Sequence, residues 1–495
     1  MIAEVRAPAA GPLAGTVLAP PSKNYTTRYV LASALAKGHS TVLRPAVQDD
    51  AIALVGCLRR LGAQIEASDA TGEPLDFVLE NDGKVARLDI HGFGDAPKLD
   101  SPAPLDPENA GAVLRMLMGV CAVLPEVRFE TSHADSLGKR PNRDLLDAFA
   151  QLGIEIECES ETGCLPITMR GGIARMRAHF ALRREAEGIP ADGAVTVVVS
   201  GGVSSQFCSA LMFLAPMLDE NIIIEVTGKL RSRPLIATTR GVLARAGVIV
   251  ESSTTDRIHL IRAGQKFATN RWDANGDWPG SAAILAAAAV VPGSKICVRG
   301  LHADDQGEQL CLDYYRAAGH DIVWAPDAGA ADDLVFTHAD GVPRAAAING
   351  DLCTDAVLAM MSAAVVADGT SRFVGIRNLQ FKECDRVREP LAELAAVFAT
   401  ALPDEDGALP NIAKSLWFEP ADDPDTIHIT GWPAGFTGGI EVDGRGDHRV
   451  IMMLSVVALA CRDGLRIRGA EHVSKSFPGW FDTLRALGAR VEFHR

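Results

Sequence analysis

The chain has 495 residues, of which 47% are hydrophobic and 22% charged, and its formal net charge is −15. This length exceeds what one ordinary hydrophobic core supports, so we expect two large domains or an array of repeats. The composition indicates a soluble globular protein, and the acidic balance argues against nucleic acid as a general partner. A phosphate-binding function would therefore need a local cluster of basic residues.

The cysteines and the N-terminal stretch bear on the cellular compartment. Ten cysteines are spread from Cys57 to Cys461 without a CxxC pair. The opening MIAEVRAPAAG lacks the basic and apolar regions of a signal peptide, and apolar runs such as residues 281–291 are too short to span a bilayer. We therefore expect free thiols in a cytoplasmic protein that is not associated with membranes.

The segment PPSKNYTTRYVLASALAKG (20–38) predicts a helix over residues 25–37 that stops at Gly38. Two cations, Lys23 and Arg28, lie near its N-terminal end, where the helix macrodipole favours an anion. Short polar residues in the same stretch would add hydrogen-bond donors: Ser22, Asn24, Thr26 and Thr27. The stretch predicts either an anion site or a solvated helix start with two chance bases.

One pattern recurs along the chain, namely an amphipathic helix, a glycine and a short strand. It covers residues 54–67, 145–158, 241–252, 311–324 and 480–493, and a weaker copy without the glycine covers 391–402. Near-even spacing of these copies indicates duplication. We predict two similar halves, with a hinge near residues 272–280, a second crossing before Lys23 and a ligand cleft between the halves.

Several other segments place hydroxyls or cations directly before apolar helices. GGVSSQF (201–207) has the donors of a phosphate cradle but lacks the GK[ST] of a Walker A motif. DHR (447–449) precedes a nearly all-apolar stretch, and KECDR (382–386) is dense in charge. Each segment alone fits a capped or solvated helix start. Together they predict helix N-termini that hold small, multiply anionic ligands.

A set of short motifs resembles one known family. The chain carries, in order between residues 20 and 481, PSKNYTTR, NAGAVLR, KRPNRDLLDAF, GGVSSQF, RSRP, TDA, NLQFKECDR, GDHR and SKSFPGWF. In these it resembles the 5-enolpyruvylshikimate-3-phosphate synthases, or 3-phosphoshikimate 1-carboxyvinyltransferases, a family of enolpyruvyl transferases. The resemblance implies an α/β (α+β) fold of two similar domains, each of three βαβαββ repeats, in an inside-out α/β barrel with an active site in the interdomain cleft.

The resemblance also divides the chain and implies a reaction. Residues 1–20 and 275–495 would form the domain on the phosphoenolpyruvate side with the catalytic acids, and residues 21–274 the domain on the shikimate 3-phosphate side. The family transfers the enolpyruvyl group of phosphoenolpyruvate to the 5-hydroxyl of shikimate 3-phosphate through a tetrahedral ketal, releasing phosphate on the shikimate pathway to chorismate and the aromatic amino acids. A monomer is expected. No cofactor or metal is implied, and the sequence has no His/Cys cluster with ligand spacing.

The resemblance carries over to individual residues. Asp355 would accept the proton of the 5-hydroxyl, and Glu383 would handle the proton at the enolpyruvyl methylene, with Lys23 and His448 nearby as further catalytic residues. Shikimate 3-phosphate would be bound by Lys23, Asn24, Arg28, Ser204, Ser205, Gln206, Ser232, Asp355, Asn378 and Lys382. Phosphoenolpyruvate would be bound by Lys23, Gly111, Arg140, Gln206, Arg386, Arg449 and Lys475.

Some residues depart from the family pattern, notably Asn24, Ala112 and Leu235, and they leave the acceptor substrate open. One alternative is a UDP-N-acetylglucosamine enolpyruvyl transferase, which shares the fold but does not match KRPNRDLLDAF. Another is transfer to a different phosphorylated alcohol. A third is a non-catalytic sensor of phosphate ligands, which would not need Asp355, Glu383 and Lys23 together.

Overall fold

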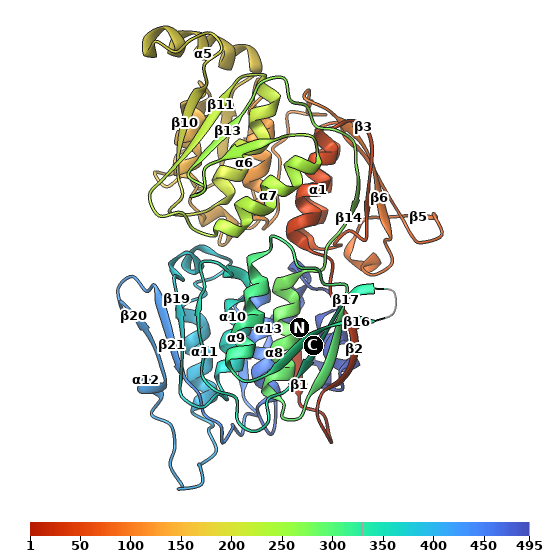
Figure 1. Ribbon diagram of the computed structural model, residues 1–495, viewed down its shortest axis with the longest axis vertical. Coiled ribbons are helices and arrows are strands. Elements are labelled where there is room, and N and C mark those ends of the chain that lie inside the picture. Colours follow the sequence, from red (N-terminus) through yellow and green to blue (C-terminus); the bar gives the residue numbers. More distant parts are fainter. Residues whose placement is uncertain (328–329, 495) are drawn as a thin grey trace. The chain divides into compact units, whose positions relative to one another are not determined.

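The computed structural model describes residues 1–327 and 330–494, which divide into two compact units (Figure 1). Unit 1 comprises Met1–Pro20 and Asn275–Arg495, and unit 2 comprises Pro21–Ala274. Each unit has its own hydrophobic core. The described residues contain no helix that is both long and apolar enough to cross a membrane.

Among its described residues, unit 1 holds three four-stranded sheets, in the orders β22-β23-β1-β24, β16-β17-β15-β2 and β18-β19-β21-β20. Each sheet combines parallel and antiparallel pairs, such as parallel β22 and β23 beside antiparallel β23 and β1. The strands are β1 (Ile2–Arg6), β2 (Ala14–Leu18), β15 (Lys295–Arg299), β16 (Asp321–Asp327), β17 (Ala330–Thr337), β18 (Ala347–Asn349), β19 (Thr370–Val374), β20 (Leu416–Glu419), β21 (Thr426–Thr430), β22 (Glu441–Asp443), β23 (Leu465–Arg468) and β24 (Arg490–His494).

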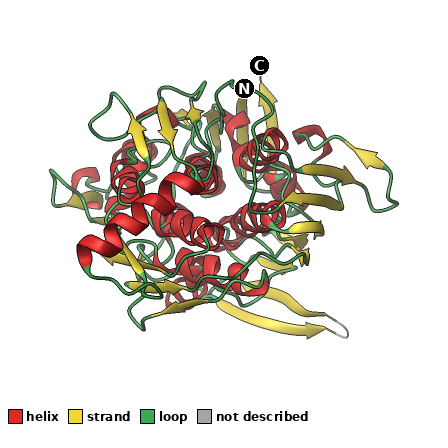
Figure 2. Ribbon diagram, turned by 90° about the horizontal axis from the view of Figure 1, so that it is seen from above, coloured by secondary structure: helices red, strands yellow, loops and turns green. Residues whose placement is uncertain are grey.

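Three helices of unit 1, α8, α10 and α13, pack against one another inside the sheets. Every residue of these helices is buried, as expected for helices that are apolar all round. Figure 2 shows the helices of the protein in red and the strands in yellow. The helices of the unit are α8 (Trp278–Val290), α9 (Cys311–Ala317), α10 (Val357–Ala364), α11 (Arg388–Phe398), α12 (Ile412–Ser415), α13 (His448–Leu459) and α14 (Trp480–Ala486), with short 3₁₀ turns η3 (Gly307–Leu310), η4 (Thr354–Ala356), η5 (Arg377–Phe381) and η6 (Ala470–Lys475).

Unit 2 follows the same plan, with sheets in the orders β10-β11-β13-β12, β14-β3-β6-β4-β5 and β7-β9-β8. None of the sheets in the described part of the chain closes on itself. The strands are β3 (Lys37–Leu43), β4 (Gln64–Ser68), β5 (Pro74–Leu75), β6 (Arg87–Phe93), β7 (Val127–Phe129), β8 (Glu155–Glu157), β9 (Ile167–Arg170), β10 (Val195–Ser200), β11 (Ile222–Thr227), β12 (Val250–Ser252), β13 (Ile258–Ile261) and β14 (Arg271–Asp273).

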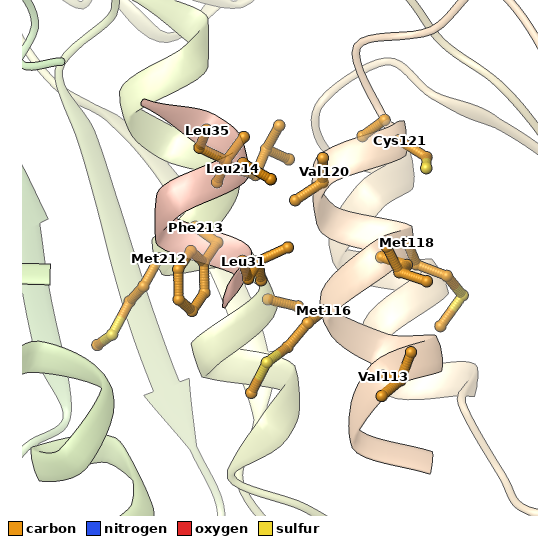
Figure 3. Close-up of a cluster of buried hydrophobic side chains, with 14 of the residues drawn as sticks. Leu31, Leu35, Val113, Met116, Met118, Val120, Cys121, Met212, Phe213 and Leu214 are labelled. Atoms are coloured by element: carbon orange, nitrogen blue, oxygen red, sulfur yellow. The ribbon is translucent and has the colours of Figure 1, made fainter. Parts of the chain in front are cut away.

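The core of unit 2 gathers around α1, α3 and α6, whose side chains meet in Figure 3, among them Leu31, Val120 and Leu214. Helices α3 and α6 come so close that a Cβ on Gly119 would lie 2.4 Å from the carbonyl oxygen of Ala210. The helices of the unit are α1 (Lys23–Leu35), α2 (Asp49–Arg60), α3 (Gly111–Cys121), α4 (Arg143–Ala150), α5 (Ile173–Glu187), α6 (Gln206–Leu218) and α7 (Arg233–Arg245), with η1 (Leu79–Asn81) and η2 (Leu137–Lys139).

The predicted repeat is confirmed in five copies. Helices α2, α4, α7, α9 and α14 each lead through one glycine into strands β4, β8, β12, β16 and β24. All five glycines have φ between 84° and 104°, which a residue with a side chain rarely adopts: Gly62, Gly153, Gly247, Gly319 and Gly488. In the weaker copy, α11 instead leads into a long connection before β20.

The predicted bounds of the first helix are wrong at both ends. Helix α1 begins at Lys23, because Ser22 caps it with Oγ accepting the N–H of Tyr25, and it ends at Leu35. Gly38 does not stop the helix but lies in β3 with a φ of 126°. The Oγ1 of Thr26 accepts the N–H of Ala46, so its hydroxyl serves the fold.

Candidate functional site

Topology places the polar motifs at helix starts within each unit. Helix α6 connects the parallel strands β10 and β11, α10 connects β18 and β19, and α13 connects β22 and β23. In such a connection the helix begins at the carboxyl ends of the strands, where open α/β sheets bind ligands. The motifs GGVSSQF, TDA and GDHR lie at these starts.

In unit 2, Lys23 forms a nearly buried ion pair. Its Nζ lies 3.0 Å from Oδ2 of Asp50, with the two side chains 14% and 6% exposed. Asp50 is in the first turn of α2, so the pair joins the starts of α1 and α2. A buried partner holds the long lysine side chain in place at the N-terminal end of α1, where a cation is otherwise disfavoured.

The guanidinium of Arg28 ties α1 to α7. Its Nε donates to Oγ1 of Thr239 at 2.9 Å, and its Nη1 donates to the carbonyl of Asn24 at 2.9 Å. The same Thr239 hydroxyl lies 2.8 Å from Oγ of Ser209 on α6. Helices α1, α6 and α7 are thus joined, and these are the helices at whose starts Lys23, Ser204–Gln206 and Ser232 lie.

Arg115 of α3, the last residue of the NAGAVLR motif, contacts the start of α6. Its Nη1 donates to Oε1 of Gln206 at 2.8 Å and to Oγ of Ser204 at 3.3 Å. Its guanidinium also lies 5.0 Å from the ring of Phe207. Ser205, directly before α6, is buried. Residues 204–206 are therefore held in place by the buried guanidinium of Arg115.

Ser232, the residue before α7, has a left-handed backbone with a φ of 50°. This conformation is strained for a residue with a side chain, and such strain concentrates at functional positions. The following Arg233 and the nearby Arg240 both pair with Asp256, which fixes the start of α7.

Gly111 and Arg140 are in direct contact. A Cβ on Gly111 would lie 2.8 Å from Nη1 of Arg140, so the guanidinium packs against the bare backbone at the start of α3. Arg140 is buried, and its Nη2 is 3.4 Å from Oγ of Ser136 and 3.5 Å from Oδ1 of Asn109. The glycine thus leaves room for a cation beside a helix N-terminus.

In unit 1, Arg386 is the centre of the charged residues. Its Nε and Nη2 bind the two oxygens of Asp447 at 2.7 and 3.1 Å. Its Nη2 also lies 2.7 Å from Oε2 of Glu383, and its Nη1 lies 3.3 Å from Oδ1 of Asp355. Burial alone would lower the pKa of Arg386, but the charges of Asp447, Glu383 and Asp355 raise it overall. The two predicted proton-transfer acids therefore share one permanently charged partner.

Two lysines complete this arrangement. The Nζ of Lys475 lies 2.8 Å from Oε1 of Glu383, and both side chains are under a tenth exposed, at 6% and 8%. The Nζ of Lys382 lies 3.5 Å from Oδ1 of Asp355. Next to Asp355, Oγ1 of Thr354 accepts a hydrogen bond from Asn378 at 3.4 Å. Both acids are thus held by cations.

The start of α13 is capped by Asp447, whose Oδ1 accepts the N–H of Arg449 at 2.8 Å. His448 is buried, and its Nδ1 lies 4.0 Å from Oδ1 of Asp447. Arg449 is only 4% exposed, yet its Nε and Nη1 have no hydrogen-bond partner in the described part of the chain. An unsatisfied buried guanidinium at a helix N-terminus is suited to binding an anion.

Sequence reasoning overlooked the partners that hold the predicted residues. Asp447 and Arg115 were visible in the motifs DHR and NAGAVLR, but only the fold reveals what they contact. Asp50 and Glu308 carried no signal in the sequence. Across residues 1–327 and 330–494, no three His, Cys, Asp or Glu side chains are arranged to hold a metal ion, and the cysteines form no disulfide.

Comparison with known proteins covers nearly the whole chain. The family model described as EPSP synthase (3-phosphoshikimate 1-carboxyvinyltransferase) matches residues 8–484. A 3-phosphoshikimate 1-carboxyvinyltransferase of Deinococcus radiodurans is 38% identical over 482 residues, which cover 97% of this chain and 95% of that protein. The protein of that name from Methanosarcina mazei is 29% identical, covering 97% of this chain and 96% of its own.

Solved structures are similar over the same extent. The EPSP synthase from Acinetobacter baumannii matches all of this chain and all of its own with a TM-score of 0.71 and 19% sequence identity. At this identity the likeness concerns the fold, and it agrees with the mixed α/β architecture described above.

Proposed function

The chain belongs to the EPSP synthase family, and we propose that it transfers the enolpyruvyl group of phosphoenolpyruvate to the 5-hydroxyl of shikimate 3-phosphate. The main support for this proposal is that Arg386 holds both Asp355 and Glu383. The reaction moves protons at two different atoms, so it needs two such groups. Asp355 and Glu383 contact different nitrogens of that guanidinium and have different lysine partners, Lys382 and Lys475. Two acids in different settings can divide the proton transfers.

In the proposed addition step, Asp355 takes the proton of the 5-hydroxyl as its oxygen attacks C2 of phosphoenolpyruvate. C3 gains a proton from the ammonium group of Lys23, which gives a tetrahedral ketal. In the elimination step, the bond from C2 to the phosphate oxygen breaks and the phosphate leaves with the proton that Asp355 holds. Glu383 takes a proton from the methyl group, which restores the double bond, and this proton then returns to Lys23. Lys23 and His448 assist these proton transfers. Buried Arg386 keeps both acids oriented throughout.

Phosphoenolpyruvate carries a phosphate and a carboxylate, so its binding needs several cations. We assign this role to Lys23, Gly111, Arg140, Gln206, Arg386, Arg449 and Lys475. Arg449 supports the assignment most, because its buried Nε and Nη1 lack partners in the described residues. Arg386 is mainly occupied by carboxylates, and we assign the second N–H of its Nη1 to the ligand.

For shikimate 3-phosphate we assign Lys23, Asn24, Arg28, Ser204, Ser205, Gln206, Ser232, Asp355, Asn378 and Lys382. Hydroxyls before α6 and α7 suit a phosphate, since helix N-termini favour anions. Because Arg28 already gives several N–H groups to Thr239 and to carbonyls, we expect it mainly to position α1. We further propose a cytoplasmic monomer that acts without a cofactor, nucleic acid or membrane.

The test is phosphate release from phosphoenolpyruvate by the purified chain, with shikimate 3-phosphate or UDP-N-acetylglucosamine as acceptor. We expect turnover only with shikimate 3-phosphate, and a loss of about 10²-fold or more in Asp355→Asn and Lys23→Met. Matched controls are Asp313→Asn and Lys37→Met, whose side chains are exposed and which should keep full activity. Turnover with UDP-N-acetylglucosamine alone, or none with either acceptor, would refute the proposal.

A further inference from the structure

A buried acid outside the proposed catalytic residues touches the backbone of Asp355. Glu308 lies in η3 and is 3% exposed. Its Oε1 accepts the N–H of Asp355 at 3.3 Å, whereas its Oε2 has no hydrogen-bond partner in the described residues. A carboxylate with an unsatisfied buried oxygen is expensive for a fold, and an apolar residue would serve packing better.

The segment that carries Glu308 is anchored firmly. Two residues earlier, the side chain of Gln306 donates to the carbonyl of Gly276 at 3.0 Å and to Oδ2 of Asp304 at 2.8 Å. Turns η3 and η4 pack against each other and both pack on α8. Glu308 therefore cannot move away from Asp355 without disturbing the start of a buried helix.

The charged groups that face Glu308 are acidic. Burial, followed by the charges of Asp355 and Asp277, raises the pKa of Glu308 to about 7. The thiols of Cys311 and Cys353 also lie nearby, and burial raises the pKa of both well above the ordinary range, so they stay neutral. The cations Lys382 and Arg386 bind Asp355. Among the described residues, Glu308 has no ion pair of its own.

Building on the proposed function, we propose that Glu308 is a positioning residue for Asp355. Its Oε1 fixes the main chain of Asp355, and its negative charge makes the Asp355 carboxylate a stronger base toward the acceptor hydroxyl. Lys382 and Arg386 hold Asp355 in the charged form, which alone would weaken it as a base. The negative charge of Glu308 offsets part of the effect of these two cations, and Glu308 does so without contacting substrate.

The test compares wild type, Glu308→Gln and the exposed control Asp313→Asn over a range of pH. Glutamine keeps an Oε1 that can accept the N–H of Asp355 but removes the charge. We expect kcat at pH 8 to fall roughly tenfold, because Asp355 becomes a weaker base, while both KM values change less than about twofold. At pH 6, where Glu308 is largely protonated, the variant should approach wild type, and the ionisation near neutral pH should vanish from its kcat profile.

A second readout does not depend on turnover. With ¹³C-labelled aspartate, the carboxyl carbon of Asp355, identified by its absence in Asp355→Asn, should titrate at lower pH in Glu308→Gln than in wild type. An unchanged titration, or an equal loss of kcat at pH 6 and pH 8, would make Glu308 a packing group and overturn the inference. An inactive wild-type protein would instead refute the proposed function, and the titration would still decide on Glu308.

Discussion

Arg449 gives a prediction in which stability and function move in opposite directions. Its buried Nε and Nη1 lack partners in the described residues, and it lies in the first turn of α13. A buried unsatisfied donor costs about 1–3 kcal/mol, and a cation at a helix N-terminus costs a further ~0.5 kcal/mol. Replacing Arg449 with methionine, an apolar residue of similar length, should therefore stabilise the ligand-free protein by about 2 kcal/mol.

The assay is urea unfolding of the free protein, together with the KM for phosphoenolpyruvate at saturating shikimate 3-phosphate. Arg449→Met should unfold at higher urea, yet its KM should rise by two orders of magnitude or more, since a charged hydrogen-bonding partner of the ligand is lost. Adding phosphoenolpyruvate should raise the stability of wild type much more than that of the variant.

Arg386→Met is the matched control for burial. Its guanidinium pairs with Asp447, Glu383 and Asp355, so removal leaves three carboxylates without their buried partner. It should lose about 3–5 kcal/mol of stability. If Arg449→Met is destabilised to a similar extent, Arg449 has a structural partner and the reasoning fails. An unchanged KM in Arg449→Met would remove it from the phosphoenolpyruvate site.

Three further changes test other contacts. Gly111→Ala places a Cβ 2.8 Å from Nη1 of Arg140, so the guanidinium must shift, and we expect about a tenfold rise in KM for phosphoenolpyruvate with stability within ~0.5 kcal/mol of wild type. Gly119→Ala places a Cβ 2.4 Å from the backbone oxygen of Ala210, and urea unfolding should reveal a loss of about 2 kcal/mol despite better helix propensity; equal stability would mean that α3 and α6 pack less closely. Burial raises the pKa of Glu308 from 4.5 to about 7, so between these pH values the folded protein keeps a proton that the unfolded chain has lost. The free energy of unfolding is therefore highest below about pH 4.5, and roughly 3 kcal/mol of it is lost as the pH rises through 7. Glu308→Gln should therefore gain stability relative to wild type between pH 5 and pH 8, and a constant difference would contradict this.

The elements of the fold were predictable where the sequence encodes them locally. In five copies of the repeat, a glycine with a positive φ follows the helix, such as Gly62 at 100°, so a single residue marks the position of the turn. The end of α1 was not predictable in this way. Gly38 also has a positive φ, but it lies within β3, where its backbone pairs with Gly92. A glycine signals an unusual backbone without saying which element contains it.

The motifs single out the residues that we propose for ligand binding, but not the residues that hold them in place. Lys23, Arg386 and Ser204 stand in recognisable motifs, whereas their partners Asp50, Asp447 and Arg115 are 27, 61 and 89 residues away in sequence. Such pairs form only through tertiary packing, and no local pattern specifies which acid meets which base. Local motifs therefore identify the candidate residues, and tertiary packing determines which partners orient them.

The cations at the helix starts differ in whether a carboxylate of the protein balances their charge. Lys23 at α1 and Arg386 before α11 have carboxylate partners within 3.0 Å, so the fold already neutralises them. Arg449 at α13 has none for Nε and Nη1 in the described chain, although both burial and the macrodipole disfavour its charge. A protein selected only for stability would have replaced such a residue, as substitutions that relieve buried charge are readily found. Under the proposed function, carboxylates already hold Lys23 and Arg386 in place beside the ligands, whereas Arg449 is the cation whose charge an arriving anion would balance.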